Sequence, residues 1–194
     1  MINENLNRAS FYNERKSVQE AFGKYEIVTL PKGFNIFKLT KGAAEEHPKY
    51  GLSPWWSPVK PFKQDYEGAL GRYQQAKLNK IDMSAMVRYM SAVCIDWNDL
   101  DNYVQVELTD SAKAYWGTFA PQSKFSSESY DLKVIRERKA QEKRVNGNAQ
   151  LPNELGVLES WQLYIPNLKE EHVKRCQLIN AHDMVALGMA FGFV

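Results

Sequence analysis

The sequence predicts one α+β domain, with a mixed or antiparallel central sheet and several helices packed on it. The chain has 194 residues, of which 44% are hydrophobic, so it can enclose one well-buried core. Stretches of alternating apolar and polar residues occur both before and after a region with helical apolar spacing. The five tryptophans are spread from Trp55 to Trp161, which indicates a single core that draws on most of the chain.

The N-terminal residues 1–24 are polar and charged, and we expect them to form a helical or polar segment ahead of the domain at residues 25–194. A short apolar stripe that includes Val18 and Phe22 indicates a weak helix, and Gly23 is expected to end it.

Two strands are predicted next, over residues 25–30 and 34–40, with a turn between them. In the second strand Ile36 and Lys38 share one face and Phe37 lies on the other. Because apolar residues fall on both faces, this strand is expected to be central in the sheet.

Helical spacing of apolar residues follows. One helix is predicted over residues 65–79, with Asp65 as its cap. A second helix begins after Asp82, and its apolar stripe consists of Met83, Met86, Val87, Met90, Cys94 and Trp97.

The second half of the chain returns to strand patterns. Strands are predicted over residues 103–109, 114–119 and 160–165. A polar region separates the last two and contains an exposed helix over residues 132–144. The chain beyond Lys169 is predicted to hold a strand or a helix.

An unusual segment, residues 51–62, contains three aromatic residues and three prolines. Proline fixes φ and has no N–H group, so we expect neither a helix interior nor a central strand here. A stiff segment with the adjacent Trp55 and Trp56 is typical of a pocket wall, and equally of a well-packed corner.

The net charge of +2 gives no global electrostatic argument for a nucleic-acid partner. Residues 133–144 are the exception, with six cations against two glutamates. Arg136, Arg138 and Lys139 are therefore candidate phosphate contacts. The alternative is an exposed helix whose charges pair at i,i+4 spacing.

Motifs for several kinds of site are missing. The spacing of Cys and His fits no zinc site, and the acidic run from Asp96 lacks the glycine of an EF-hand loop. No phosphate loop, dinucleotide fingerprint or nucleophile elbow occurs. No metal is therefore expected. Cys94 and Cys176 are expected to be buried free thiols, and a single disulfide is the alternative.

The N-terminus lacks an apolar run of signal-peptide length, and the apolar C-terminal run is too short to span a bilayer. We therefore expect a protein without a membrane span. Its expected location is the cytoplasm, or a destination reached by a secretion route that needs no signal peptide.

The order of elements carries the most specific signal. A strand with Lys38 is followed by the segment Trp55-Trp56-Ser57-Pro58, then by helices, and then by a late strand with Gln162 and Tyr164. Over residues 25–166, this order resembles the mono-ADP-ribosyltransferase family.

The resemblance implies a toxin or effector enzyme that consumes NAD as a substrate and modifies a macromolecular target. In the family a first-strand arginine contacts NAD, a serine motif supports the site, and a late-strand glutamate engages the nicotinamide ribose. Lys38, Ser57 and Gln162 stand at these positions here. Because glutamine carries no negative charge, Glu159 or Glu154 would have to supply it.

The implied site has two parts. The catalytic residues are Glu159, Gln162 and Ser57. The residues expected to bind NAD are Lys38, Trp55, Trp56 and Tyr164, because a cation pairs with the pyrophosphate and aromatic rings stack on the nicotinamide.

Two other functions are compatible with the sequence. In the first, the chain is a non-catalytic interaction domain that docks through the aromatic residues 55–62. In the second, it is a nucleic-acid-binding module that uses residues 133–144. The partner would then be a protein or a nucleic acid that the sequence does not identify.

Overall fold

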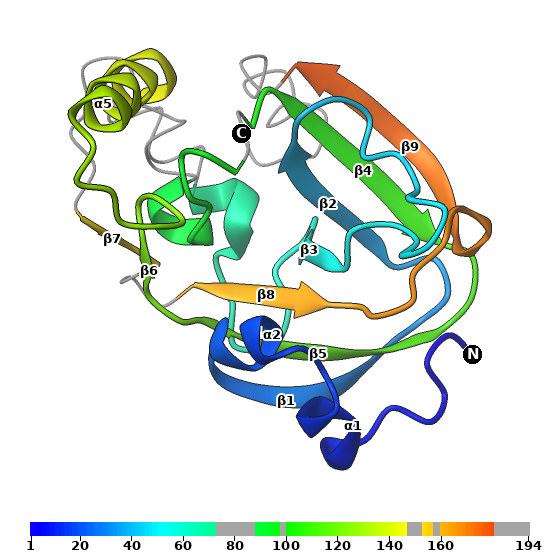
Figure 1. Cartoon of the computed structure of the whole chain (residues 1–194). Helices are drawn as coiled ribbons and strands as arrows, with labels where there is room; N and C mark the ends of the chain where they lie inside the picture. The colour runs from blue at the N-terminus through cyan, green and yellow to red at the C-terminus, as the bar shows by residue number, and fades with distance from the viewer. Residues whose placement is uncertain (73–87, 98–99, 147–152, 157–159, 181–194) are drawn as a thin grey trace.

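Seven antiparallel strands form one sheet in the computed structural model, which describes residues 1–72, 88–97, 100–146, 153–156 and 160–180. The spatial order is β1-β5-β8-β3-β2-β4-β9 (Figure 1). In that order the strands are Phe22–Leu30, Ala112–Phe119, Trp161–Tyr164, Trp55–Pro58, Asn35–Thr40, Asn102–Leu108 and Val173–Asn180.

Short helices and a small second sheet surround the main sheet. The labelled helices are α1 (Arg8–Tyr12), α2 (Lys16–Glu20), α5 (Leu132–Asn146) and the 3-10 turn η1 (Glu170–His172), and residues 68–72 and 88–91 are also helical. The second sheet pairs β6 (Gln122–Ser123) with β7 (Glu154–Leu155). The chain is thus a single α+β domain, as the sequence predicts. Among the described residues, no helix is long and apolar enough to cross a membrane.

The main sheet changes direction at β3. In Figure 1, β1, β5 and β8 run across the picture, whereas β2, β4 and β9 run steeply, and the short β3 lies between the two halves. β3 pairs with β8 through Trp55 and Trp56, and with β2 through Ser57 and Pro58. β3 is therefore joined to each half of the sheet through two residue pairs.

The two faces of the sheet are packed differently. We call them the Lys38 face and the Ser57 face, after residues that point to opposite sides of adjacent strands. One continuous apolar cluster covers the Lys38 face and takes residues from both halves, including Trp116, Leu163, Trp56, Ile36 and Val104. Because one cluster takes residues from both halves, we infer that the halves converge on the Lys38 face, and we call this the inner side of the bend.

The Ser57 face carries two separate clusters. The first lies under α1 and α2 and contains Phe11, Val18, Phe22, Tyr115 and Tyr164, with Trp55 packed against it. The second covers β2 and β4 and contains Phe37, Val59, Ala69, Leu70, Met90, Leu100 and Tyr103. The Ser57 face is thus the outer side of the bend, where the halves diverge.

Most predicted strands are confirmed, since strands occupy the expected ranges 25–30, 34–40, 103–109, 114–119 and 160–165 to within a few residues. The exposed helix over 132–144 is confirmed as α5, and the region beyond Lys169 contains β9. Of the two helices predicted between 65 and 97, helical residues are seen at 68–72 and 88–91. Their other predicted residues lie largely outside the described residues.

Two predictions about secondary structure are wrong. Gly23 does not end a helix, because α2 ends at Glu20 and Gly23 lies inside β1. Residues 55–58 form β3, which is central in the sheet. The prolines are tolerated because Pro54 precedes the strand and Pro58 ends it. Val59 then supplies the next donor, from its N–H to the carbonyl oxygen of Asn35 at 3.1 Å.

Both cysteines are free thiols. Cys94 is buried, and burial raises the pKa of its thiol to about 11. The expectation that Cys176 is buried is wrong, because it lies exposed on the edge strand β9.

Gly117 of β5 allows β1 to pack closely, which gives a stability test. A Cβ atom at this position would overlap the carbonyl oxygen of Lys24 and lie 2.6 Å from Cδ1 of Phe22. We expect Gly117→Ala to lower the free energy of unfolding by about 1–3 kcal/mol, as other overpacked sites do. Urea unfolding followed by tryptophan fluorescence measures this change.

Gly71→Ala is the matched control, because Gly71 is helical and no atom lies within 4 Å of the position that a Cβ atom would take. Here alanine should raise the free energy of unfolding by up to about 1 kcal/mol. Equal effects of the two substitutions would contradict the packing described for Gly117.

Candidate functional site

The residues predicted to form the site divide between the two faces of the sheet. Alternation along the strands places Ser57, Trp55, Gln162 and Tyr164 on the Ser57 face and places Lys38 and Trp56 on the Lys38 face. The predicted catalytic Glu159 lies outside the described residues. Glu154 lies exposed on β7. The structure therefore does not bring Lys38 together with Ser57 and Gln162.

Lys38 lies beside Trp56 on the inner side of the bend. The pairing of Phe37 with Ser57 continues to Lys38 and Trp56, which are direct neighbours across β2 and β3. The ammonium nitrogen of Lys38 lies 5.3 Å from the centroid of the Trp56 ring. This geometry is a cation–π contact.

The surroundings of Lys38 are apolar. Burial lowers the pKa of its side chain to about 8. Within the described ranges, no carboxylate forms an ion pair with Lys38, and the indole nitrogen of buried Trp56 has no hydrogen-bond partner. The two side chains thus hold unused donor groups on the same face.

On the outer side of the bend, Ser57 and Gln162 form a polar pair of positions, which we call the polar strip. Trp55 pairs with Tyr164 and Trp56 with Leu163, so the same register places Ser57 opposite Gln162 at the point where β3 and β8 separate. Ser57 is half-buried and Gln162 is 2% exposed. Nε2 of Gln162 donates to the carbonyl oxygen of Ala21 at 3.4 Å.

The polar strip separates the two apolar clusters of the Ser57 face. On one side the Trp55 ring contacts Tyr164, with the centroids 4.7 Å apart, and Phe22, with the centroids 5.4 Å apart. On the other side lie Phe37 and Val59, both buried. Hydrogen-bonding groups are thus flanked by aromatic and aliphatic side chains on this face.

A carboxylate that the sequence analysis did not select, Glu14, also lies on the Ser57 face. The Tyr164 hydroxyl donates to Oε2 of Glu14 at 3.0 Å. Burial, together with this carboxylate, raises the pKa of Tyr164 and raises that of Tyr115 to about 12. Glu14 lies between α1 and α2, in a polar stretch without periodicity, so no sequence signal distinguishes it from other surface glutamates.

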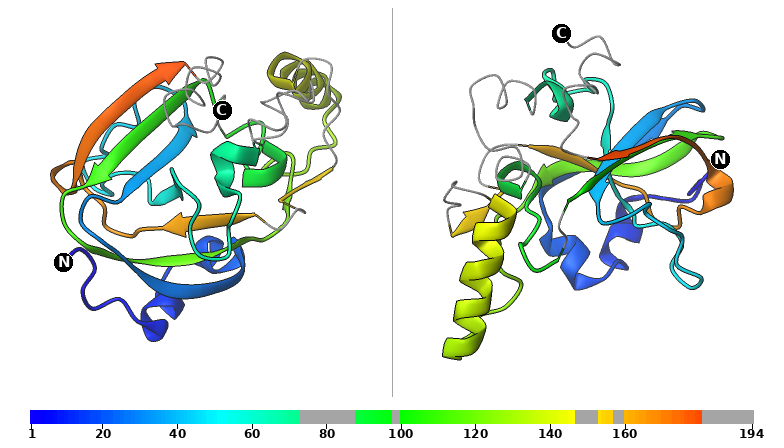
Figure 2. Two further views of the ribbon diagram at one scale, coloured as in Figure 1. Left: turned by 180° about the vertical axis from the view of Figure 1, so that it is seen from behind. Right: turned by 90° about the horizontal axis from the view of Figure 1, so that it is seen from above.

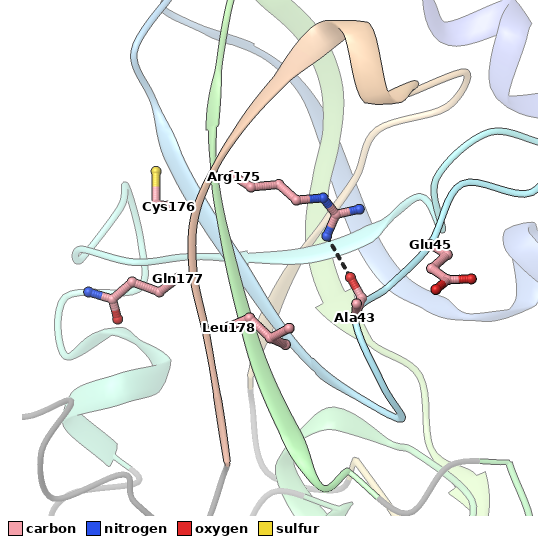
Figure 3. Close-up of a pocket in the computed structure, with 6 residues that line it drawn as sticks. All are labelled: Ala43, Glu45, Arg175, Cys176, Gln177 and Leu178. Carbon is pink, nitrogen blue, oxygen red and sulfur yellow. Dashed lines mark hydrogen bonds between the residues drawn. The ribbon is translucent and has the colours of Figure 1, made fainter.

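A hollow of about 340 Å³ lies elsewhere, at the edge strand β9 (Figure 3). It is lined by Ala43, Glu45, Arg175, Cys176, Gln177 and Leu178. Arg175 donates to the carbonyl oxygens of Ala43 and Ala44 and to the carboxylate of Glu170. The arginine thus anchors the loop after β2 to β9, and none of the predicted site residues lines this hollow.

The three predicted phosphate contacts on α5 differ in exposure. Arg136 and Lys139 are exposed, whereas Arg138 is half-buried and points back toward the domain. Among the described residues, no group of His, Cys, Asp and Glu side chains is arranged to hold a metal ion.

No protein-family model matches the sequence, and no curated protein matches it. The fold is similar to that of a chain in the structure of Tne2 in complex with Tni2, with 12% sequence identity and a TM-score of 0.42. The match covers 82% of this chain and 96% of that chain. A likeness this weak carries no inference about function.

Lys38 allows a pH-dependent test of the site. Its pKa falls from 10.5 to about 8 on folding, so folding must work against the burial of a charge below pH 8. A shift of this size corresponds to at most about 3 kcal/mol, partly offset by the contact with Trp56. We therefore expect Lys38→Met to raise the free energy of unfolding at pH 7 by about 1–3 kcal/mol.

The lowered pKa of Lys38 makes the stability of the folded chain increase with pH in the alkaline range. Between pH 8 and 10.5 the folded chain has released the Lys38 proton while the unfolded chain still binds it, so wild-type stability rises with pH. The advantage of Lys38→Met should therefore shrink in urea unfolding at pH 10. Lys32→Met, at an exposed turn residue, serves as the control. An advantage of equal size at both pH values would rule out a buried charge at Lys38.

Proposed function

We propose that this protein is an NAD-consuming transferase that breaks the bond between nicotinamide and ribose and transfers ADP-ribose to a macromolecular target. One observation carries the proposal. The segments that the family resemblance assigns to the NAD site are β2, β3 and β8, and these strands are consecutive neighbours at the centre of the sheet (Figure 1). A long stretch of chain separates β3 from β8 in the sequence.

The chemistry sets what the site must supply. When the C1′–N bond breaks, its electron pair stays with nicotinamide, which leaves as a neutral base. The ribose C1′ becomes an oxocarbenium-like centre, and a nucleophile of the target then attacks it and loses a proton. The site therefore needs a negative charge near C1′ and hydrogen bonds that hold the ribose.

The Ser57 face offers both kinds of group. In the proposal, the Ser57 hydroxyl and the Gln162 amide hold the ribose, and the aromatic cluster around Trp55 and Tyr164 borders the nicotinamide. Among the described residues, Glu14 supplies a carboxylate to this cluster, because it accepts a hydrogen bond from the Tyr164 hydroxyl. Glu159, three residues before Gln162, is the carboxylate that the family resemblance favours.

Lys38 has a different role in this proposal from the one that the resemblance implies. It points to the opposite face from the polar strip, so it supports Trp56 beneath β3 and does not contact the pyrophosphate. The site therefore lacks the family's first-strand cation on the Ser57 face of β2.

The alternative function as a docking domain is less well supported. Docking through residues 55–62 requires that the aromatic side chains be exposed. Trp56 and Val59 are each 3% exposed, and Phe62 packs edge-on against Trp116. Trp56 and Val59 are therefore core residues. Within residues 55–62, Lys60 and Pro61 are the exposed residues.

Nicotinamide release from NAD tests the proposal. We expect NAD at millimolar concentration to quench tryptophan fluorescence, because Trp55 borders the polar strip. We also expect slow release of free nicotinamide, which Ser57→Ala lowers at least tenfold. Chromatography of the reaction mixture measures the product.

The charged residue is identified by comparing Glu14→Gln with Glu159→Gln. The variant that removes the essential carboxylate should lose about 100-fold or more in nicotinamide release while NAD binding persists. Glu20→Gln, an exposed change in α2, is the matched control and should leave the rate unchanged. Absence of any NAD binding at millimolar concentration would overturn the proposal.

A further inference from the structure

Helix α5 extends away from the sheet, as the right-hand view of Figure 2 shows. Its 15 residues contain few large apolar side chains. A helix of this composition is held in place mainly by polar contacts. These contacts define an inner side of α5, which faces the domain, and an outer side, which faces away from it.

The inner side of α5 is anchored by three polar residues. Arg138 donates to the carbonyl oxygen of Ser127 at 2.6 Å and to its hydroxyl at 3.0 Å, and its guanidinium lies over the Phe125 ring. Glu142 forms a 3.0 Å ion pair with Lys124. Gln141 donates to the carbonyl oxygen of Ile95 at 3.2 Å.

The outer side of α5 is cationic. At 100° per residue, five cations fall within an arc of roughly 140° that is opposite Arg138. All five are exposed, and they are Lys133, Arg136, Lys139, Lys143 and Arg144. We call this arc the cationic face.

Pairing within the helix does not neutralise four cations of this face, namely Lys133, Arg136, Lys139 and Lys143. The helix has two glutamates, and Glu142 is already paired with Lys124 of the preceding segment. In the described part of the chain, Glu137 forms no ion pair, and neither does Lys133, Arg136, Lys139 or Lys143. The i,i+4 pairing that would make this an ordinary solvated helix is therefore not formed.

The distribution of side chains on the cationic face discriminates among anionic partners. The face carries no aromatic residue for base stacking and no row of apolar residues for insertion into a bilayer. It also presents no amide side chain for reading base edges, because Gln141 points inward. What remains is an arc of charges along the helix, suited to a regular array of phosphates.

The shape of α5 favours double-stranded DNA. A helix with its side chains is about 10–12 Å wide, which matches the roughly 12 Å width of the major groove. Cations near the two edges of the arc, Lys139 on one side and Lys133 on the other, would then face the phosphates of both strands. The major groove of an RNA duplex is too narrow to admit a helix.

We propose that the cationic face of α5 binds the phosphate backbone of duplex DNA, without sequence specificity, from within the major groove. The site is separate from the polar strip, and the proposal does not depend on the proposed reaction. Arg138 is a positioning residue in this proposal, because it holds the helix and does not touch the phosphates.

The test is binding of the full chain to a fluorescent 20-base-pair DNA duplex, measured by anisotropy at several salt concentrations. Phosphate contacts from Lys133, Arg136, Lys139 and Lys143 predict that affinity falls roughly 100-fold or more between about 50 and 200 mM salt. The variant Lys133→Gln/Arg136→Gln/Lys139→Gln/Lys143→Gln should weaken binding at low salt at least 30-fold and flatten the salt dependence.

A second variant controls for net charge. Lys16→Gln/Lys32→Gln/Lys41→Gln/Lys60→Gln removes four exposed cations outside α5 and should change affinity less than threefold. Circular dichroism and urea unfolding establish that both variants fold. Equal weakening by the two variants would overturn the proposal, because net charge alone would then explain binding.

Two further measurements decide between partners. An RNA duplex of the same length should bind at least tenfold more weakly than DNA, and equal binding would overturn the groove assignment. Vesicles with 30% phosphatidylserine should not compete with DNA for the protein. Vesicle binding without DNA binding, or no DNA binding at about 50 mM salt, would overturn the proposal outright.

Discussion

The whole arrangement depends on β3, a strand of four residues that joins the two halves of the sheet through two residue pairs on each side. A strand places successive side chains on opposite faces. Trp56 therefore enters the continuous core on the inner side of the bend, while Trp55 and Ser57 point outward. Because so few pairs connect the halves, the packing of Trp56 against both of them is what fixes the bend.

The bend explains why polar groups gather where they do. On its inner side the two halves converge, and apolar residues such as Trp116, Trp161 and Leu163 fill the space. On its outer side the halves diverge, so the apolar clusters separate and leave Ser57 and Gln162 between them. A buried amide such as that of Gln162 is stable there because Ala21 accepts its hydrogen bond.

The sequence predicts the strands that have clear alternation, and it predicts that Ile36 and Lys38 share a face, because both follow from local periodicity. It does not predict β3 as a strand, since Pro54 and Pro58 flank a very short run and mask the alternation of its residues. Whether Lys38 and Ser57 share a face depends on the register between β2 and β3, which periodicity within one strand does not contain. Glu14 escapes prediction for a similar reason, because only tertiary packing brings it to Tyr164.

The inner side of α5 and the residue that precedes β8 both contact residues 90–95. Gln141 of α5 bonds to Ile95, whose N–H donates to the carbonyl oxygen of Lys124. A few residues earlier, the carbonyl oxygen of Met90 accepts a 2.8 Å hydrogen bond from Ser160, which directly precedes β8. The α5 anchor and the start of β8 therefore share one small packed region. The polar anchor of α5 therefore lies close to the residues that lead into β8.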